Sequence, residues 1–389
     1  MSKLLIIVVI FTVSWGGLNF FGSGWLLVPV LASLLLIAPM ILGQRFYFTI
    51  VDLFFYCFIV TLVMSSILNS NDKTLNYLLA WLVGTYYCLY RVPIFIAYRF
   101  HKNTLDLIVS YGAISIALIS ILEQILYFSN GYILFFDLPR FDYDHANYMG
   151  LFYRSYAFSN EPSNLAYYLL LTLPFVLRSL GKISFIFVII AILPTFSASG
   201  YALGFLALSC VALYESVKKN GFRFFVYFFS VIILIPIFLI LASQVEILDK
   251  IFDKVLLNSS SGSASVRLSR LLESLAVFMN NPITGSGPGF WSSSFGVSPN
   301  NIYLLVLTEG GLFGLLFFLI FLFGLCFSDG RKLLPVTSTQ IHLVLVGLGF
   351  GFFTGVSFSL IGLFFITLYN QSRRLHVNEL FEYSKSTHK

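Results

Sequence analysis

Charged side chains are scarce in this sequence of 389 residues. Asp, Glu, Lys and Arg make up 10% of the residues, hydrophobic residues make up 58%, and the mean hydropathy is +0.89. Soluble globular domains carry about 25% charged residues. The deficit excludes a soluble domain and indicates a chain whose solvent is the lipid bilayer.

Cysteine and histidine are also few. The four cysteines all lie inside apolar runs, which excludes a disulfide framework and a CxxC metal site. They are Cys57, Cys88, Cys210 and Cys326. Of the five histidines, only His145 falls in a segment that could face outward, so no histidine metal cluster is expected. The net charge of +6 needs no nucleic-acid partner, because the basic residues fall in short segments between apolar runs.

Apolar runs long enough to cross a bilayer are abundant. The first begins at Leu4 and has no small-residue cleavage site, so we predict a retained span and not a signal peptide. The last is too long for one helix, and the Thr354-Gly355 break divides it into two short spans. We therefore predict one integral membrane domain, 1–389, that is all-α with about twelve transmembrane helices. The runs are 4–21, 24–42, 47–68, 75–97, 105–128, 163–181, 183–199, 200–217, 222–244, 301–327 and 341–370.

The basic residues predict the orientation of these helices. With the N-terminus in the cytoplasm, sixteen of the 23 Lys and Arg residues fall on the cytoplasmic side and seven on the outer side. Both termini are then cytoplasmic. The same arrangement leaves two long outer loops, 129–162 and 245–300, while the other connections are short. We expect the functional site on these two loops.

The first outer loop contains Arg154 and Glu161. Pro162 suits the first turn of a helix, which puts Glu161 at or beside the N-cap, near the positive end of the helix dipole. Glu161 is therefore either a candidate catalytic base or simply a cap. Arg154 lies among aromatic residues in the sequence. Its guanidinium group is permanently charged and can donate two parallel hydrogen bonds to a phosphate. Arg140 and His145 are further candidates for substrate contact, with ordinary loop polarity as the alternative.

The second outer loop contains a predicted amphipathic helix. Leucine and methionine recur at helical spacing from Leu268 to Met279. Arg267, Arg270 and Ser274 share the opposite side. Two arginines on one stripe can clamp a diphosphate, and the alternative is that they bind lipid headgroups at the membrane surface.

The glycine-rich stretch GSGPG, 285–289, does not predict a nucleotide-binding loop, because no GK[ST] follows it and no strand precedes it. Its glycines are expected to allow a tight turn or a close backbone approach. Asn300 and Asn301 then open a span in which Glu309 lies about 12 Å along the helix. An ionisable residue at that depth is a functional candidate by default. The alternative is a carboxylate that bonds a neighbouring span for packing.

Together these segments resemble the O-antigen polymerase and ligase superfamily of bacterial inner-membrane glycosyltransferases. Its first motif begins with arginine and ends in Glu-Pro or Asn-Pro, and Ala157 stands here where the family has glycine. The second is an arginine-led helix followed by a glycine-rich stretch, and the third joins an asparagine pair to a later glutamate. The matching residues, motif by motif, are Arg154, Phe158, Glu161 and Pro162; Arg267 and 281–290; and 300–304 with 309–314.

The resemblance covers the chain from about residue 100 onward and implies a GT-C-like fold with two large periplasmic loops in the bacterial inner membrane. It implies transfer of a growing glycan from undecaprenyl diphosphate to a sugar hydroxyl of a lipid-linked repeat unit, without a metal or other cofactor. Arg154 and Arg267 would stabilise the departing diphosphate, and Glu161 would activate the hydroxyl. The remaining candidates would bind substrate: Arg270, Asn300, Asn301, Tyr303, Glu309, Arg140 and His145. The implied partners are the lipid-linked oligosaccharide, membrane lipids, a chain-length regulator and a flippase.

Two other functions stay open. Ligases of this family typically have a histidine where this sequence has Asn300, which favours a polymerase over an O-antigen ligase that transfers the glycan to lipid A-core. A transporter or flippase for lipid-linked oligosaccharides also needs many spans. It should show internal repeats and charges along a central cavity. This chain shows no repeat, and its intramembrane charges are few: Asp52, Glu123 and Glu309.

Overall fold

The structure is a computed structural model of the whole chain. The residues it describes are 2–12, 32–37, 40, 48–69, 74–131, 148–149, 152–159, 161–219, 262–296, 299, 301–327, 335–352 and 361–387. The elements in chain order are α1 (Ser2–Thr12), α4 (Ile50–Leu68), α5 (Thr74–Leu79), η1 (Ala80–Arg91), α6 (Val92–Arg99), α7 (Lys102–Asn130), β1 (Tyr148–Met149), β2 (Phe152–Tyr153), α8 (Pro162–Ser179), α9 (Gly181–Ile192), η2 (Leu193–Thr195), α10 (Ala198–Lys219), α13 (Gly262–Asn280), α14 (Phe290–Ser294), α15 (Ile302–Phe327), α16 (Ser338–Gly349), η3 (Phe350–Phe352) and α17 (Ile361–Thr387).

The predicted helical architecture is confirmed. Within the described residues, β structure is limited to the antiparallel pair of two-residue strands β1 and β2. Among the residues that the structure describes, five helices are long and apolar enough to cross a membrane: Ile50–Leu68, Thr74–Arg99, Lys102–Asn130, Ser199–Lys218 and Ile302–Phe327. Shorter apolar helices are Lys3–Thr12, Gly181–Thr195 and Ser338–Phe352. The chain is thus a multi-pass membrane protein.

The predicted count of about twelve spans and the GT-C-like fold are not confirmed by these five helices. The predicted run at 222–244 and most of the one at 24–42 lie outside the described residues. The C-terminal run contains two helices, since α16 ends at Gly349 and α17 begins at Ile361, while the prediction that each is a span is not tested. The Thr354-Gly355 break itself lies outside the described residues.

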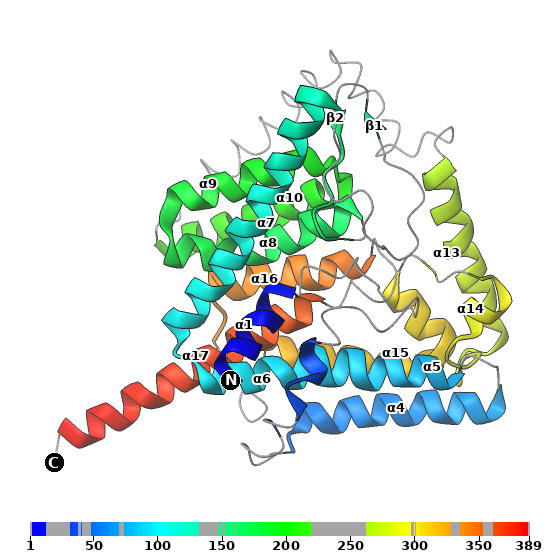
Figure 1. Ribbon diagram of the computed structural model, residues 1–389. Coiled ribbons are helices and arrows are strands. Elements are labelled where there is room, and N and C mark those ends of the chain that lie inside the picture. The colour runs from blue at the N-terminus through cyan, green and yellow to red at the C-terminus, as the bar shows by residue number, and fades with distance from the viewer. Residues whose placement is uncertain are drawn as a thin grey trace.

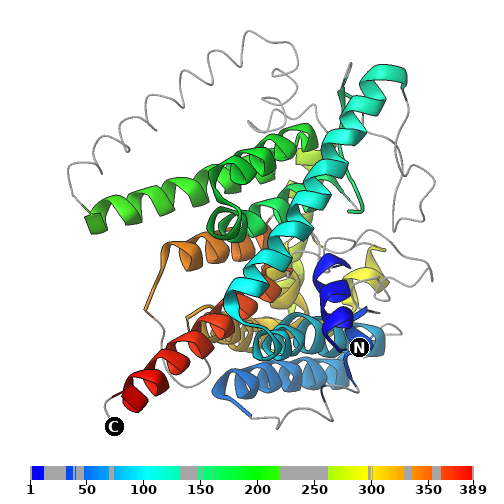
Figure 2. The same cartoon turned by 60° about the vertical axis from the view of Figure 1, so that its left-hand side comes forward.

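The helices form two groups with a third pair between them (Figure 1). In the first group α4 packs against α15, beside α5, η1 and α6; the second group consists of α7, α8, α9 and α10. Helix α16 packs against α8 and α10, while α17 packs against α6 and α16, so this pair joins the groups. Figure 2 shows the same order, with the C-terminal part of α17 extending beyond the bundle.

Aromatic side chains fill the centre of the first group. Phe58 of α4 packs edge-on against Trp81 of η1, with the ring centroids 5.0 Å apart. Both rings also contact Phe318 of α15, and all three side chains are buried. Because lipid offers no hydrophobic driving force between helices, close packing of this kind is what holds membrane helices together.

Asp52, the first of the ionisable residues predicted inside an apolar run, has a structural explanation at the start of α4. Its carboxylate forms a capping box with Thr49, the N-cap residue. It also pairs with Arg91 at 2.8 Å and accepts a hydrogen bond from the Tyr86 hydroxyl at 2.9 Å. The charge is therefore neutralised by a neighbouring helix, as a buried charge must be.

Candidate active site

The first motif lies on a loop between β2 and α8 that is bound to α7. The backbone N–H groups of Tyr156 and Ala157 both donate to Oε2 of Glu123, each at 3.0 Å. Glu123 belongs to α7 and its side chain is fully buried. Ser155 adds two bonds, since its N–H donates to the carbonyl of Pro194 and its hydroxyl to that of Ser120, both at 2.9 Å. The motif is thus attached to the membrane helices and is not a free surface loop.

Ala157 occupies the left-handed region of backbone conformation, with φ of 47°. Glycine adopts that region without strain, whereas an L-residue with a Cβ pays a steric cost. The conformation therefore explains why glycine suits this position of the motif. In this chain the smallest side-chain-bearing residue takes its place, and it is fully buried.

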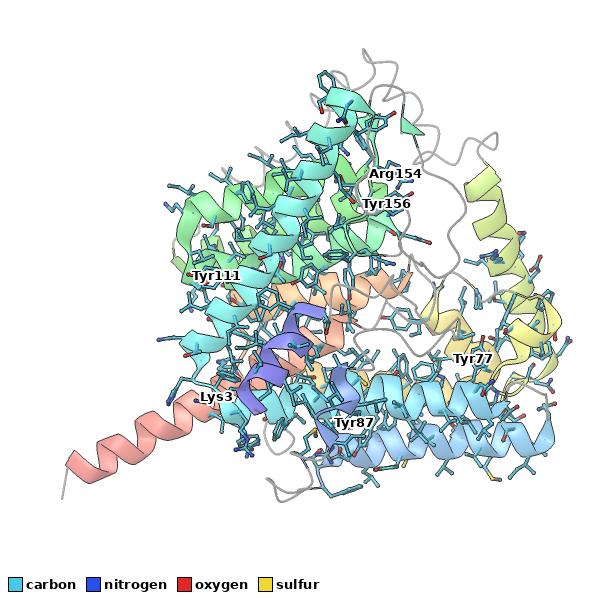
Figure 3. The ribbon with its side chains drawn as sticks, viewed as in Figure 1. Lys3, Tyr77, Tyr87, Tyr111, Arg154 and Tyr156 are labelled. Carbon is cyan, nitrogen blue, oxygen red and sulfur yellow. The ribbon has the colours of Figure 1, made fainter. Side chains whose placement is uncertain are left out.

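Arg154 is half-buried, and its guanidinium is directed by backbone carbonyls. Nε donates to the carbonyl of Thr195 at 3.3 Å, and Nη2 donates to that of Phe196 at 3.4 Å. Figure 3 places Arg154 and Tyr156 beside the α7–α10 group. Guanidinium offers five N–H donors, so two bonds to carbonyls orient the fork and leave donors for a ligand.

Glu161 is the N-cap residue of α8, and Pro162 occupies the first turn, as predicted. Its side chain is exposed and makes no capping bond to the backbone; Oε2 instead accepts a hydrogen bond from the Ser163 hydroxyl at 2.9 Å. Among the described side chains, no ion pair joins Glu161 to Arg154 of the same motif. The helix dipole, and not Arg154, is the positive partner of this carboxylate.

The predicted amphipathic helix is confirmed as α13, which has an unusual orientation. Ser274, on the predicted polar side, is fully buried. The apolar side points away from the protein, since Leu272 is 58% exposed and Met279 74% exposed. A soluble amphipathic helix buries the opposite face, so this orientation is the one expected beside lipid. Arg270 is half-buried on the inner side, whereas the Arg267 side chain lies outside the described residues.

The second motif pairs with the third through backbone hydrogen bonds. The N–H of Ser286 donates to the carbonyl of Thr308 at 2.8 Å, and the N–H of Gly287 donates to that of Glu309 at 3.1 Å. In the other direction the N–H of Leu312 donates to the carbonyl of Pro282 at 2.9 Å. The glycine-rich stretch is therefore a segment that approaches another backbone closely, as one of the two sequence-based interpretations expected.

Helix α15 accommodates this approach with a kink at Gly311, where φ is 65° and ψ is −165°. That backbone region is open almost only to glycine. A Cβ at Gly311 would lie 2.7 Å from the amide nitrogen of Gly285. Because of the kink, backbone N–H and C=O groups within residues 308–312 are available to bond the loop. This explains why the sequence Glu309-Gly310-Gly311 belongs to the motif.

Glu309 is 1% exposed, and its Oε1 accepts a hydrogen bond from the N–H of Gly289 at 2.9 Å. Next to it, the Trp291 indole donates to the hydroxyl of Thr308 at 2.9 Å, and Trp291 is fully buried. The carboxyl group therefore binds the second loop, whereas the alternative interpretation expected a bond to a neighbouring span. A contact between Glu309 and substrate stays a prediction.

Asn301 and Tyr303 are both half-buried at the start of α15. Oδ1 of Asn301 accepts hydrogen bonds from the N–H groups of Tyr303 and Leu304 at 2.9 and 3.1 Å, so this asparagine caps the helix. The Tyr303 hydroxyl donates to the carbonyl of Leu348 at 2.8 Å. Capping directs the oxygen of Asn301 into the helix and its NH2 group away from it. Three other predicted site residues lie outside the described residues: Arg140, His145 and Asn300.

The comparisons with known proteins agree with the motifs. Residues 183–319 match the model of a family described as O-antigen ligase. This match supports the O-antigen polymerase and ligase superfamily. No curated protein matches it. The matched segment includes the second and third motifs of the superfamily and begins after the first, and it supports a glycosyltransferase-like function of the O-antigen ligase and polymerase type.

Sequence reasoning missed several residues that build this superfamily site. Glu123 was noted only as an intramembrane charge, yet it binds the first motif. Ser65 and Asn69 of the first helix group bind the paired motifs, since the Ser65 hydroxyl donates to the carbonyl of Glu309 at 2.8 Å and Nδ2 of Asn69 to that of Gly285 at 3.1 Å. The rule that an intramembrane carboxyl group is functional by default could have identified Glu123. No signal in the sequence identifies the other two.

Within the described residues, no three His, Cys, Asp or Glu side chains lie close enough to hold a metal ion. What the site offers is an oriented guanidinium at Arg154 and an exposed carboxylate at Glu161. A guanidinium can stabilise a diphosphate, and a carboxylate can accept a proton from a hydroxyl.

Proposed function

We propose that this protein is a polysaccharide polymerase of the bacterial inner membrane with a periplasmic active face and cytoplasmic termini. It transfers a growing glycan from undecaprenyl diphosphate to a sugar hydroxyl of a lipid-linked repeat unit. In this step the bond between the donor C1 and the phosphate oxygen breaks, and the acceptor oxygen bonds to C1. The hydroxyl proton leaves to a base, and undecaprenyl diphosphate departs with the bonding electron pair.

The family match carries this proposal, because it supports a function of the O-antigen ligase and polymerase type for the segment that contains two of the three motifs. Sugar diphosphates are already activated donors, so the barrier lies mainly in the charge that develops on the departing phosphate. Guanidinium groups held in a fixed orientation stabilise that negative charge electrostatically. The bonds from Arg154 to the carbonyls of Thr195 and Phe196 provide such orientation.

The remaining roles follow from position. Arg267 contributes a second guanidinium group that binds the diphosphate, and Arg270 on the same helix also binds the substrate. Glu161 acts as the base for the acceptor hydroxyl, since it is exposed and its described hydrogen bond is to a serine hydroxyl that can reorient. The NH2 group of Asn301 donates to a sugar or phosphate oxygen, because helix capping already occupies its oxygen.

The choice of polymerase over ligase depends on Asn300, which stands where ligases of the superfamily typically have histidine. An amide cannot accept the proton of an acceptor hydroxyl as an imidazole can. The ligase alternative is favoured by a different observation, the description of the matched family as O-antigen ligase. The two functions differ only in the acceptor, so an experiment that varies the acceptor separates them.

The test uses purified protein with a single lipid-linked repeat unit, followed by a glycan gel. A polymerase produces a ladder without any other acceptor. Replacing one stabilising donor typically costs about 10²- to 10³-fold in rate, so Arg154→Ala and Arg267→Ala should each slow ladder formation by that factor. Arg154→Lys keeps the charge but loses the fork and should restore only part of the rate.

Lys218→Ala is the matched control for the loss of a cation, because Lys218 is exposed in α10, outside the proposed site, and should keep full activity. A single product that forms only when lipid A-core is added would establish a ligase instead. If several repeat units give neither product, transport of lipid-linked oligosaccharide becomes the better explanation, and the assigned roles would be abandoned.

A further inference from the structure

We propose that Glu123 is a positioning residue that sets the conformation of the loop carrying Arg154. The role deepens the proposed function, and only its activity readout rests on that function. Glu123 lies in α7, 31 residues before Arg154 in the chain, and its side chain is fully buried. No family motif of the sequence includes it.

The contact between Glu123 and the loop has the geometry of an anion site. Two successive N–H groups, those of Tyr156 and Ala157, converge on Oε2 at 3.0 Å each. The second of these residues has a positive φ, 47°. Successive N–H groups in such a conformation form a concave nest that binds anions. Here the nest is occupied by a carboxyl group of the protein itself.

Residues of α7 close to Glu123 also bind Ser155 of the loop. Nε2 of Gln124 donates to the Ser155 hydroxyl at 3.0 Å, and that hydroxyl donates to the carbonyl of Ser120 at 2.9 Å. On its other side the loop bonds to η2, through the N–H of Ser155 and the guanidinium of Arg154. The loop is therefore held between two elements, and Glu123 supplies the two bonds that fix its backbone next to Arg154.

This geometry predicts what removal of the carboxyl group does. Glu123→Ala removes the carboxyl group to which two buried N–H groups donate, so the left-handed turn at Ala157 loses this support. Arg154 then samples other positions, and the stabilisation of the departing diphosphate weakens. The expected loss in kcat is about 10- to 100-fold, with a smaller change in KM for the lipid-linked donor. Glu123→Gln keeps an acceptor oxygen and should recover most of the rate.

A labelling experiment tests the same role without any activity. Ser159→Cys places a thiol in the first loop at a position that is 3% exposed, and Ser286→Cys places one in the second loop at 5% exposed. A water-soluble maleimide reports how often each thiol is exposed, after subtraction of the rate for the four native cysteines. Adding Glu123→Ala should raise labelling of Ser159→Cys by about tenfold or more and leave Ser286→Cys unchanged.

The outcomes are distinct. Unchanged labelling of Ser159→Cys would overturn the proposal, and so would an equal rise at both thiols, which indicates global loosening. In an active preparation, Glu123→Ala and Arg154→Ala combined should be no slower than Arg154→Ala alone; additive losses would show that Glu123 does not act through Arg154. If the unsubstituted protein gives no ladder, the proposed function fails while the labelling still decides the role of Glu123.

Discussion

The loop at residues 154–159 and the loop at residues 281–289 are each bound by a buried glutamate from a membrane helix. In the first loop Glu123 accepts two N–H groups, and most of the other bonds come from side chains such as Gln124 and Ser155. In the second loop Glu309 accepts the N–H of Gly289, and most of the other bonds run from backbone to backbone.

This difference determines how much side-chain volume each loop tolerates. The first loop accommodates a Cβ at Ala157 even though the backbone there is left-handed. A loop held backbone to backbone has no such room, because a Cβ at Gly287 would lie 2.6 Å from the carbonyl oxygen of Asn69. The second loop should therefore be far more sensitive to substitution, and four changes test that comparison.

The largest effect is expected for Gly311→Ala. The new side chain strains the backbone at φ 65° and also meets the backbone of the second loop, so we expect a destabilisation of roughly 3–6 kcal/mol. The midpoint of thermal unfolding in detergent measures it. Gly310→Ala is the control, since its Cβ would meet only the flexible end of Leu62, at 3.2 Å. Equal midpoints for the two variants would refute a glycine-dependent kink.

A smaller loss is expected for Trp291→Phe, which removes the indole donor to Thr308 and leaves a small cavity. The expected destabilisation is about 2–4 kcal/mol. Trp81→Phe is the matched control, because Trp81 is also buried but its contacts are with aromatic rings. If both variants lose the same stability, the hydrogen bond to Thr308 contributes nothing beyond volume.

In the first loop, Ser155→Ala should cost about 1–2 kcal/mol, because Gln124 and the carbonyl of Ser120 each lose a buried partner. Unfolding midpoints measure this loss as well. Ser115→Ala, at a half-buried site on the same helix as Gln124 whose hydrogen bond is exposed, should change stability by less than about 0.5 kcal/mol. A cost for Ser155→Ala as large as that for Gly311→Ala would remove the contrast between the loops.

The smallest effect is expected for Ala157→Gly. Glycine relieves the left-handed strain but adds flexibility to the unfolded chain, so stability should change by between 0 and about +1 kcal/mol. The same substitution at Ala166, which is fully buried in α8, should destabilise by about 1 kcal/mol. The unfolding midpoints of the two variants should shift in opposite directions. A destabilised Ala157→Gly variant would contradict the positive φ at this position.

Several features of the site were predictable because they depend on residues close together in the chain. The N-cap position of Glu161 follows from the Pro162 next to it, and the helix at α13 follows from its own apolar spacing. The close backbone approach of the glycine-rich stretch was one of two expectations. What it approaches could not be predicted, because its partners at Asn69 and Glu309 are distant in sequence.

The sequence by itself determined that the bilayer is the solvent, that helices dominate, and which loops carry polar motifs, because hydrophobicity and helix caps act locally. Only the tertiary structure decided which face of α13 points outward, that Arg154 bonds to backbone carbonyls, and that two buried glutamates hold the two loops. Those outcomes depend on which groups meet when distant helices pack. A buried N–H or carboxyl group takes whichever partner that packing brings within reach.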